Sequence, residues 1–177
     1  MDLPKKLKSD GEFSVKLNSG IMTALPICHP TFKLWTGPKP TFDYGNKPII
    51  DYKNKPVFAE LAISRILIDA GWQSIWVETY GGTNFLKEMP TEWKLRSNNV
   101  SIPENKQSLL QRIWKISKTT ACFDVLAWKD NTVLFCEAKN KGKDRLTKPQ
   151  IRFIEGALAC GVPASSLLIV EWSNNLK

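Results

Sequence analysis

The sequence is poor in the residues that build the commonest zinc and nucleophile sites. It contains one histidine, His29, and four cysteines, Cys28, Cys122, Cys136 and Cys160. The cysteines have neither C-x-x-C spacing nor a histidine cluster beside them, which argues against a structural zinc site. A Ser/His or Cys/His catalytic pair would have to use His29, and no feature around it supports that use. We therefore expect a packing role for His29.

Long apolar runs are also absent. No run approaches the length of a membrane span, and the first residues, Met-Asp-Leu-Pro-Lys-Lys, lack the apolar core of a signal peptide. Unpaired cysteines fit a reducing compartment. These absences predict a cytoplasmic protein without a membrane partner.

Acidic residues are outnumbered by basic ones. The chain has 25 Lys and Arg against 17 Asp and Glu, which gives a net charge of +8. Such an excess favours a polyanionic partner, nucleic acid first, although it says nothing about the fold. The 177 residues, 42% of them hydrophobic, suffice for one globular domain with a sizeable core.

What the sequence does contain is a predicted β-hairpin in its second half. Two short runs rich in β-branched and aromatic residues, 123–128 and 132–139, flank Lys129-Asp130-Asn131. The last two of these three residues are of types that suit a two-residue hairpin loop. A loop of that length fixes the register of the two strands.

In that register Asp124 lies directly opposite Glu137, with the Cβ atoms about 5 Å apart on one face of the sheet. Lys139 projects from the same face because strand side chains alternate. Opposed carboxylates destabilise a hairpin, and burying them is costly unless a cation compensates. Mg²⁺ would compensate, and a lysine beside it would help to position or deprotonate the attacking water. The spacing therefore predicts metal-assisted hydrolysis of a phosphate ester.

A helix is predicted before the hairpin, over residues 56–70. Pro56 suits its first turn, Gly71 suits the position past its end, and most residues between them are apolar. Glu60 is the exception, and it allows two interpretations. It is either an acid near the helix N-terminus that faces solvent, or a third carboxylate that reaches the metal site.

Residues 83–121 are predicted to be an insertion between a strand over 73–80, which ends at Gly81-Gly82, and the hairpin. Ser101-Ile102-Pro103-Glu104 has capping-box form, so we expect a helix from there to about Ile116. The polar face of this helix carries Lys106, Arg112, Lys115 and Lys118. That face is either merely solvated or part of a groove for phosphates.

A basic segment follows the hairpin. The cations that we expect to contact phosphates there are Lys141, Lys143, Arg145 and Lys148. Thr147 and Gln150 again have capping-box spacing, Pro149 lies in the first turn of the predicted helix, and Gly161 stands just past its end. An apolar run at 167–172 predicts an interior strand.

The predicted order over residues 56–172 is helix, strand, strand, strand, helix, strand, which describes an α/β protein. The last strand–helix–strand step calls for a right-handed crossover and for parallel pairing of the final strand. Helices on both sides of a mixed sheet would explain why the hairpin is apolar on both faces. Residues 1–55, punctuated by prolines, are expected to form an irregular N-terminal extension packed on the core, with room for one or two short strands, and 56–177 are expected to form the main domain.

These residues resemble the PD-(D/E)XK nuclease superfamily, and most closely its VRR-NUC and Holliday-junction-resolvase-like branch. Phe123-Asp124 stands where the family has Pro-Asp, and Glu137-Ala138-Lys139 matches the E-x-K element. Leu146-Thr147-Lys148-Pro149-Gln150 is similar to the branch's segment that leads to a glutamine on the following helix. Glu60 stands where many members have a glutamate on the first helix. The resemblance implies a restriction-endonuclease-like αβββαβ core.

The resemblance also implies an activity, that of a Mg²⁺- or Mn²⁺-dependent endonuclease, with DNA favoured over RNA. The implied metal ligands are Asp124, Glu137, Glu60 and the backbone carbonyl of Ala138. Lys139 would stabilise or activate the attacking water, and Gln150 would orient active-site groups. Related enzymes often pair to cut two strands, so a homodimer stays open.

Two other interpretations stay open as well. The chain is either a catalytically silent nuclease-fold protein that binds nucleic acid or acts in an assembly, or another basic α/β enzyme. In the latter, Glu137 and Lys139 would form a structural ion pair.

Overall fold

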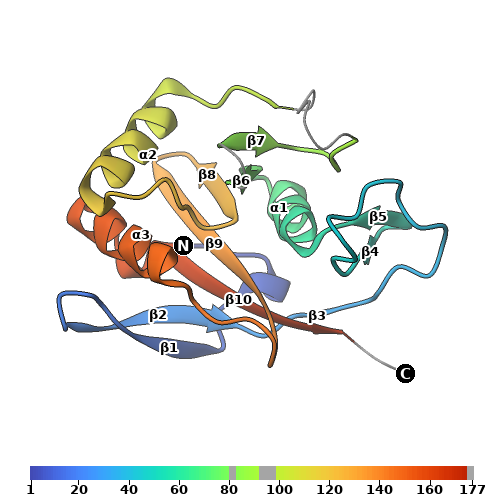
Figure 1. Cartoon of the computed structure of the whole chain (residues 1–177), viewed down its shortest axis with the longest axis horizontal. Coiled ribbons are helices and arrows are strands. Elements are labelled where there is room, and N and C mark those ends of the chain that lie inside the picture. Colours follow the sequence, from blue (N-terminus) through green and yellow to red (C-terminus); the bar gives the residue numbers. More distant parts are fainter. Residues whose placement is uncertain (80–82, 92–98, 175–177) are drawn as a thin grey trace.

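The computed structural model describes residues 1–79, 83–91 and 99–174, and within them an eight-stranded sheet carries helices on both faces (Figure 1). The strands of this sheet are β1 (Gly11–Lys16), β2 (Met22–Cys28), β3 (Thr31–Phe32), β6 (Gln73–Glu78), β7 (Asn84–Leu86), β8 (Val125–Lys129), β9 (Thr132–Asn140) and β10 (Leu167–Asn174). The helices are α1 (Ala59–Asp69), α2 (Glu104–Ser117) and α3 (Lys148–Ala159). A separate two-stranded sheet pairs β4 (Ile50–Tyr52) with β5 (Lys55–Val57). None of the described helices is long and apolar enough to cross a membrane.

The sheet is mixed, as expected for an α/β protein. Its strand order is β1-β2-β10-β9-β8-β6-β7, and β3 pairs with the end of β10. β10 runs parallel to β9 and to β2, whereas the β9–β8, β8–β6 and β6–β7 pairs are antiparallel. The predicted parallel pairing of the last strand, after a crossover through α3, is therefore confirmed.

The predicted hairpin forms with the predicted register. Val125 pairs with Cys136 and Lys129 with Thr132, which leaves Asp130 and Asn131 as a two-residue loop. Asp130 has a φ of 51°, the left-handed conformation that such loops require and that aspartate tolerates better than most residues.

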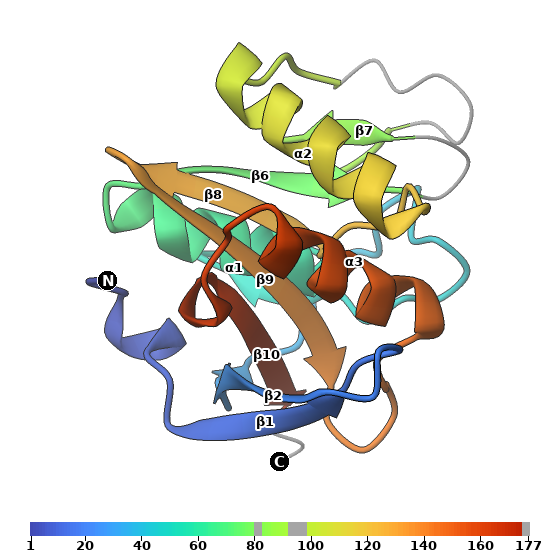
Figure 2. The ribbon, with the colours of Figure 1, turned by 90° about the vertical axis from the view of Figure 1, so that its left-hand side faces the viewer.

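Side chains of the hairpin alternate between two cores, which explains its apolar character on both faces. Cys136 packs in the cluster that includes the buried face of α1. Leu126 and Phe135 pack instead in the cluster that includes α2 and α3. Figure 2 shows α2 and α3 together on one side of the sheet with α1 behind it. Burying each such large apolar side chain contributes roughly 1.5–3 kcal/mol, so the two cores hold the hairpin from both sides.

Residues 11–28 are more regular than an irregular extension with one or two short strands. They form β1 and β2, and β2 joins the central sheet beside β10. Proline cannot donate to a sheet ladder, so Pro26 is unusual in a strand that joins the centre of a sheet. It is tolerated here because pairing with β10 involves only Ile27 and Cys28, one and two residues later.

Two helix starts also differ from the predictions. Pro56 lies in β5, paired with Asp51, so α1 begins three residues later at Ala59. At α2 the cap is Pro103, and Ser101 caps nothing. The residue before a proline disfavours helical conformation, so the helix cannot begin at Ile102 and the Ser101 capping box cannot form.

The predicted insertion contributes to the sheet as well. β7 pairs with β6, and α2 packs against α3. β6 ends at Glu78. The predicted continuation to Tyr80 and the stop at Gly81-Gly82 lie outside the described residues.

Candidate active site

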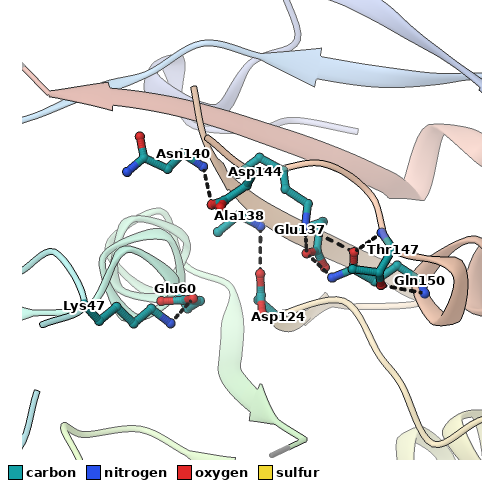
Figure 3. Close-up of polar contacts among 10 residues, drawn as sticks. Lys47, Glu60, Asp124, Glu137, Ala138, Asn140, Asp144, Thr147 and Gln150 are labelled. Carbon is teal, nitrogen blue, oxygen red and sulfur yellow. Dashed lines mark hydrogen bonds and ion pairs between the residues drawn. The ribbon is translucent and has the colours of Figure 1, made fainter. Parts of the chain in front are cut away.

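Strand β9 and the start of α3 hold a closed cluster of three polar side chains (Figure 3). Glu137 and Lys139 lie on the same side of β9, and Lys139 Nζ is 2.8 Å from Glu137 Oε1. Gln150 Nε2 donates to that same oxygen, while Gln150 Oε1 accepts from Lys139 Nζ at 3.1 Å. The shared face predicted for Glu137 and Lys139 is therefore confirmed.

Gln150 is fixed by the capping box that the sequence predicted. Its backbone N–H donates to Thr147 Oγ1, and its Oε1 accepts from the Thr147 N–H at 2.9 Å. The same side chain thus closes the first turn of α3 and holds Glu137. One residue type at one position serves both the fold and the site.

Asp124 directly precedes β8, at the N-terminal end of that interior strand. Its backbone carbonyl accepts from Val77 N–H, and its Oδ2 accepts from the Ala138 N–H at 2.9 Å. Interstrand hydrogen bonds run within the plane of a sheet. The carboxylate therefore lies between the ends of β8 and β9 rather than standing over Glu137 as a simple cross-strand pair would.

Glu60, on the first turn of α1, is buried with 6% of its surface exposed, so the solvent-facing interpretation is wrong. Lys47 Nζ lies 2.5 Å from Glu60 Oε1. The same amine lies 5.1 Å and 5.5 Å from the ring centroids of Phe58 and Trp76, within cation–π range. Figure 3 places this pair on the other side of Asp124 from Glu137.

The acids influence each other's protonation. Burial, followed by the charges of Glu137 and Glu60, raises the pKa of Asp124 well above its usual range, against the opposing effect of Lys47. Burial also raises the pKa of Glu137 to about 7, although the charge of Lys139 opposes it. For Lys47, burial alone would lower the pKa, but the charges of Glu60 and Asp124 raise it. Without a bound cation, Asp124 and Glu137 therefore keep their protons to a higher pH than free carboxyl groups do.

Two of the three carboxylates leave one buried oxygen without a hydrogen-bond partner among the described residues. Glu137 Oε2 and Glu60 Oε2 are buried in this condition, and the described contacts of Asp124 involve only Oδ2. Buried oxygens without partners are costly, and Mg²⁺ and Mn²⁺ prefer oxygen ligands. The donor set therefore fits a hard divalent cation. Over the described ranges, however, no three ligating side chains form a preassembled metal-binding group.

The basic segment after β9 is brought only partly to the site. Lys143 and Arg145 line a hollow that also includes Lys139, and Lys143 lines a second hollow beside Glu60 and Ala138. Lys141 and Lys148 are exposed and line neither of the two.

Two residues differ from the sequence-based view. Lys47 was missed, because it lies in a proline-rich segment without periodicity and reaches Glu60 only through the tertiary fold. His29 is half-exposed at the surface, where it contacts Asp10 and Glu171, so the expected packing role is wrong.

Comparison of the chain with protein-family models, with curated proteins and with solved structures finds no match.

Proposed function

We propose that the protein is a metal-dependent nuclease that hydrolyses phosphodiester bonds, with DNA the favoured substrate, as in the PD-(D/E)XK superfamily that its motifs resemble. The observation that carries this proposal is the buried Glu137 Oε2, which has no hydrogen-bond partner in the described part of the chain and lies next to Asp124. A purely structural ion pair would not require a second acid or an unpartnered oxygen at its side.

The residues of the site would divide the work as follows. Asp124, Glu137 and Glu60, with the backbone carbonyl of Ala138, would hold the cation. A bound Mg²⁺ or Mn²⁺ supplies Lewis-acid polarisation of a phosphoryl oxygen and lowers the pKa of water.

Lys139 would contact the reacting groups. Its ammonium has three donors, of which Glu137 Oε1 and Gln150 Oε1 occupy two. The third is free to donate to a phosphate oxygen or to orient the attacking water. Gln150 would keep Glu137 Oε1 and Lys139 in place, so that Glu137 Oε2 stays turned to the cation.

The experiment is a cleavage assay on supercoiled, linear, single-stranded and branched DNA with Mg²⁺, with Mn²⁺ and with EDTA. We expect cleavage only with metal, and its loss in Asp124→Asn and Glu137→Gln proteins that keep their circular-dichroism spectra. Lys55→Ala, an exposed residue of β5, is the matched control and should cut like wild type. Cleavage in EDTA, or cleavage by Asp124→Asn at the wild-type rate, would contradict the proposal.

A second candidate function is binding of nucleic acid without cleavage. The absence of a preassembled three-ligand group within the described ranges favours it. It predicts retention of DNA under every metal condition without cutting, and the same assay therefore separates the two candidates.

A further inference from the structure

A hollow of about 610 Å³ opens between strand β1 and the loop that follows β9. Residues 13–16 form one wall, residues 142–146 form the other, and Lys139 lies within it. Figure 2 shows the β1–β2 hairpin and this loop at the same end of the molecule. A volume of this size accommodates a small molecule or a short segment of an extended chain, but not a double helix.

The charges in this hollow are unbalanced. Lys16, Lys143 and Arg145 are exposed and have no ion pair or hydrogen bond of the side chain within the described part. The two acids in the lining are both engaged: Asp144 Oδ2 accepts from the Asn140 N–H at 2.9 Å, and Glu171 lies 3.6 Å from His29. Unpaired cations in a concave site attract an anionic partner such as phosphate.

One wall is apolar. Phe13, Leu146 and Ile151 line it while only partly buried in the core beneath. An accessible aromatic ring stacks on a nucleobase, which adds affinity without sequence preference. A duplex presents phosphates but keeps its bases stacked inside. Cations and an aromatic ring in one hollow therefore suit an unpaired strand.

The β1–β2 hairpin is held in place before any ligand arrives. Its turn is tied to α3, because Asn18 Nδ2 and Ser19 N–H donate to the two oxygens of Glu155 at 2.7 Å and 2.9 Å. Its second strand is paired to β10. A wall fixed in this way loses little entropy on binding.

We propose that this hollow is a binding subsite for single-stranded nucleic acid, with Lys16, Lys143 and Arg145 on phosphates and Phe13 stacked on a base. The assignment rests on the proposed function for its class of substrate. It adds residues 13–16, which lie outside the nuclease-like stretch, to the substrate interface. The strand so bound would lead to Lys139.

The test is fluorescence anisotropy in EDTA, which prevents metal-dependent cleavage. Fluorescein-labelled 12-mers of thymidylate and uridylate and a labelled 12-base-pair duplex serve as probes, so that DNA and RNA are separated. We expect wild type to bind the single strands more tightly than the duplex. Phe13→Ala should weaken single-strand binding about tenfold and duplex binding no more than about twofold.

Matched variants separate stacking from packing. Phe13→Trp should bind the single strand like wild type, whereas Phe13→Leu, which keeps the apolar contact with the core, should bind it like Phe13→Ala. Lys16→Ala should reduce the slope of log affinity against log salt by roughly 0.7 for the single strand. Lys55→Ala should change nothing, since Lys55 is exposed and lies outside the hollow.

The two proposals fail in different ways. Wild-type binding by Phe13→Leu and Lys16→Ala, a duplex preference, or no binding of any probe would overturn the subsite. Metal-dependent cleavage by such a protein would still leave the nuclease proposal standing. Phe13-dependent binding of single strands without cleavage at any metal would support the subsite and reject the nuclease.

Discussion

Two lysine–glutamate pairs flank Asp124, and they are built in different ways. Glu137 and Lys139 lie on one strand, and the alternation of β9 alone brings them together. Glu60 and Lys47 come from α1 and from the segment before β4, and only the tertiary fold joins them. Lys139 of the first pair lines the hollow beside β1. Lys47 and Glu60 of the second pair line the other hollow, and Lys47 also lies over the rings of Phe58 and Trp76. We infer that the first pair performs the chemistry and that the second stabilises the acids behind it.

The largest expected contrast is in catalysis. Lys139→Ala should lower the cleavage rate by about 100-fold or more, because the proposed mechanism places its ammonium against the reacting groups. Lys47→Ala should lower the cleavage rate by less than about tenfold, because Lys47 contacts Glu60 and lies outside the hollow beside β1. Single-turnover rates at saturating Mn²⁺ measure both. Equal losses would remove the functional distinction between the two pairs.

The next contrast is in stability against pH without metal. The pKa of Glu137 is raised from 4.5 to about 7. The folded protein therefore keeps a proton that the unfolded chain releases, and the stability from that proton is fully present below about pH 4.5 and lost as the pH rises through about 7. Between pH 5 and pH 8, the free energy of unfolding of wild type should fall by up to roughly 3 kcal/mol through this proton, and Glu137→Gln should remove that fall.

Urea unfolding in EDTA at pH 5 and at pH 8 measures this pH dependence of stability for wild type and for Glu137→Gln. The free energy of unfolding of Glu137→Gln should still fall with pH, but less steeply than that of wild type, because the pKa of Asp124 is raised as well. An unchanged pH dependence in Glu137→Gln would mean that Glu137 is ionised without cost in the folded protein. That result would contradict the proposed need for a cation.

Breaking the second pair should have a smaller effect on stability. Lys47→Met leaves Glu60 buried without its partner, and with Lys47 34% exposed we expect a loss of about 2 kcal/mol in the free energy of unfolding. The double variant Lys47→Met with Glu60→Gln should recover most of it. Lys53→Met breaks a well-exposed pair with Asp69 and should change stability by less than about 1 kcal/mol. A double variant no more stable than Lys47→Met would show that Lys47 acts through packing on Phe58 and Trp76.

The smallest effect concerns the support of the first pair. Thr147→Ala removes the cap of α3 and should cost about 1 kcal/mol of stability. Gln150→Ala should cost more, because it also removes the donor to Glu137 Oε1. Thermal unfolding of the two variants gives the comparison. Equal losses would mean that the contact with Glu137 adds nothing to the capping box.

The sequence predicted the part of the site that local structure determines and missed the part that depends on the tertiary fold. The shared face of Glu137 and Lys139 followed from strand alternation, and the register that brings Asp124 beside Glu137 followed from the hairpin loop; both signals are local. The turn of the Asp124 carboxylate toward the Ala138 N–H was not predicted. Gln150 was predicted as the capping-box partner of Thr147 from the spacing of the two residues. The pairing of Lys47 with Glu60 had no local signal, because it depends on where a proline-rich segment packs.

The same holds for the fold. The hairpin, α3 and the parallel last strand were predicted, since each has its own apolar period and turn residues. The place of β2 in the central sheet was not predicted, because the tolerance of Pro26 there depends on where β10 begins to pair. The capping box predicted at Ser101 does not form. Its residue spacing is right, but Pro103 disfavours the helical conformation that Ile102 would need.

The central claim, that Asp124, Glu137 and Glu60 hold one shared cation, is tested most directly by calorimetric titration of the metal-free protein with Mn²⁺. We predict one Mn²⁺ per chain for wild type, with affinity that rises with pH through about 7 as Glu137 loses its proton. Asp124→Asn and Glu137→Gln should each weaken binding by about tenfold or more, a loss of at least about 1.4 kcal/mol. No binding by wild type, or binding that both variants leave unchanged, would contradict it.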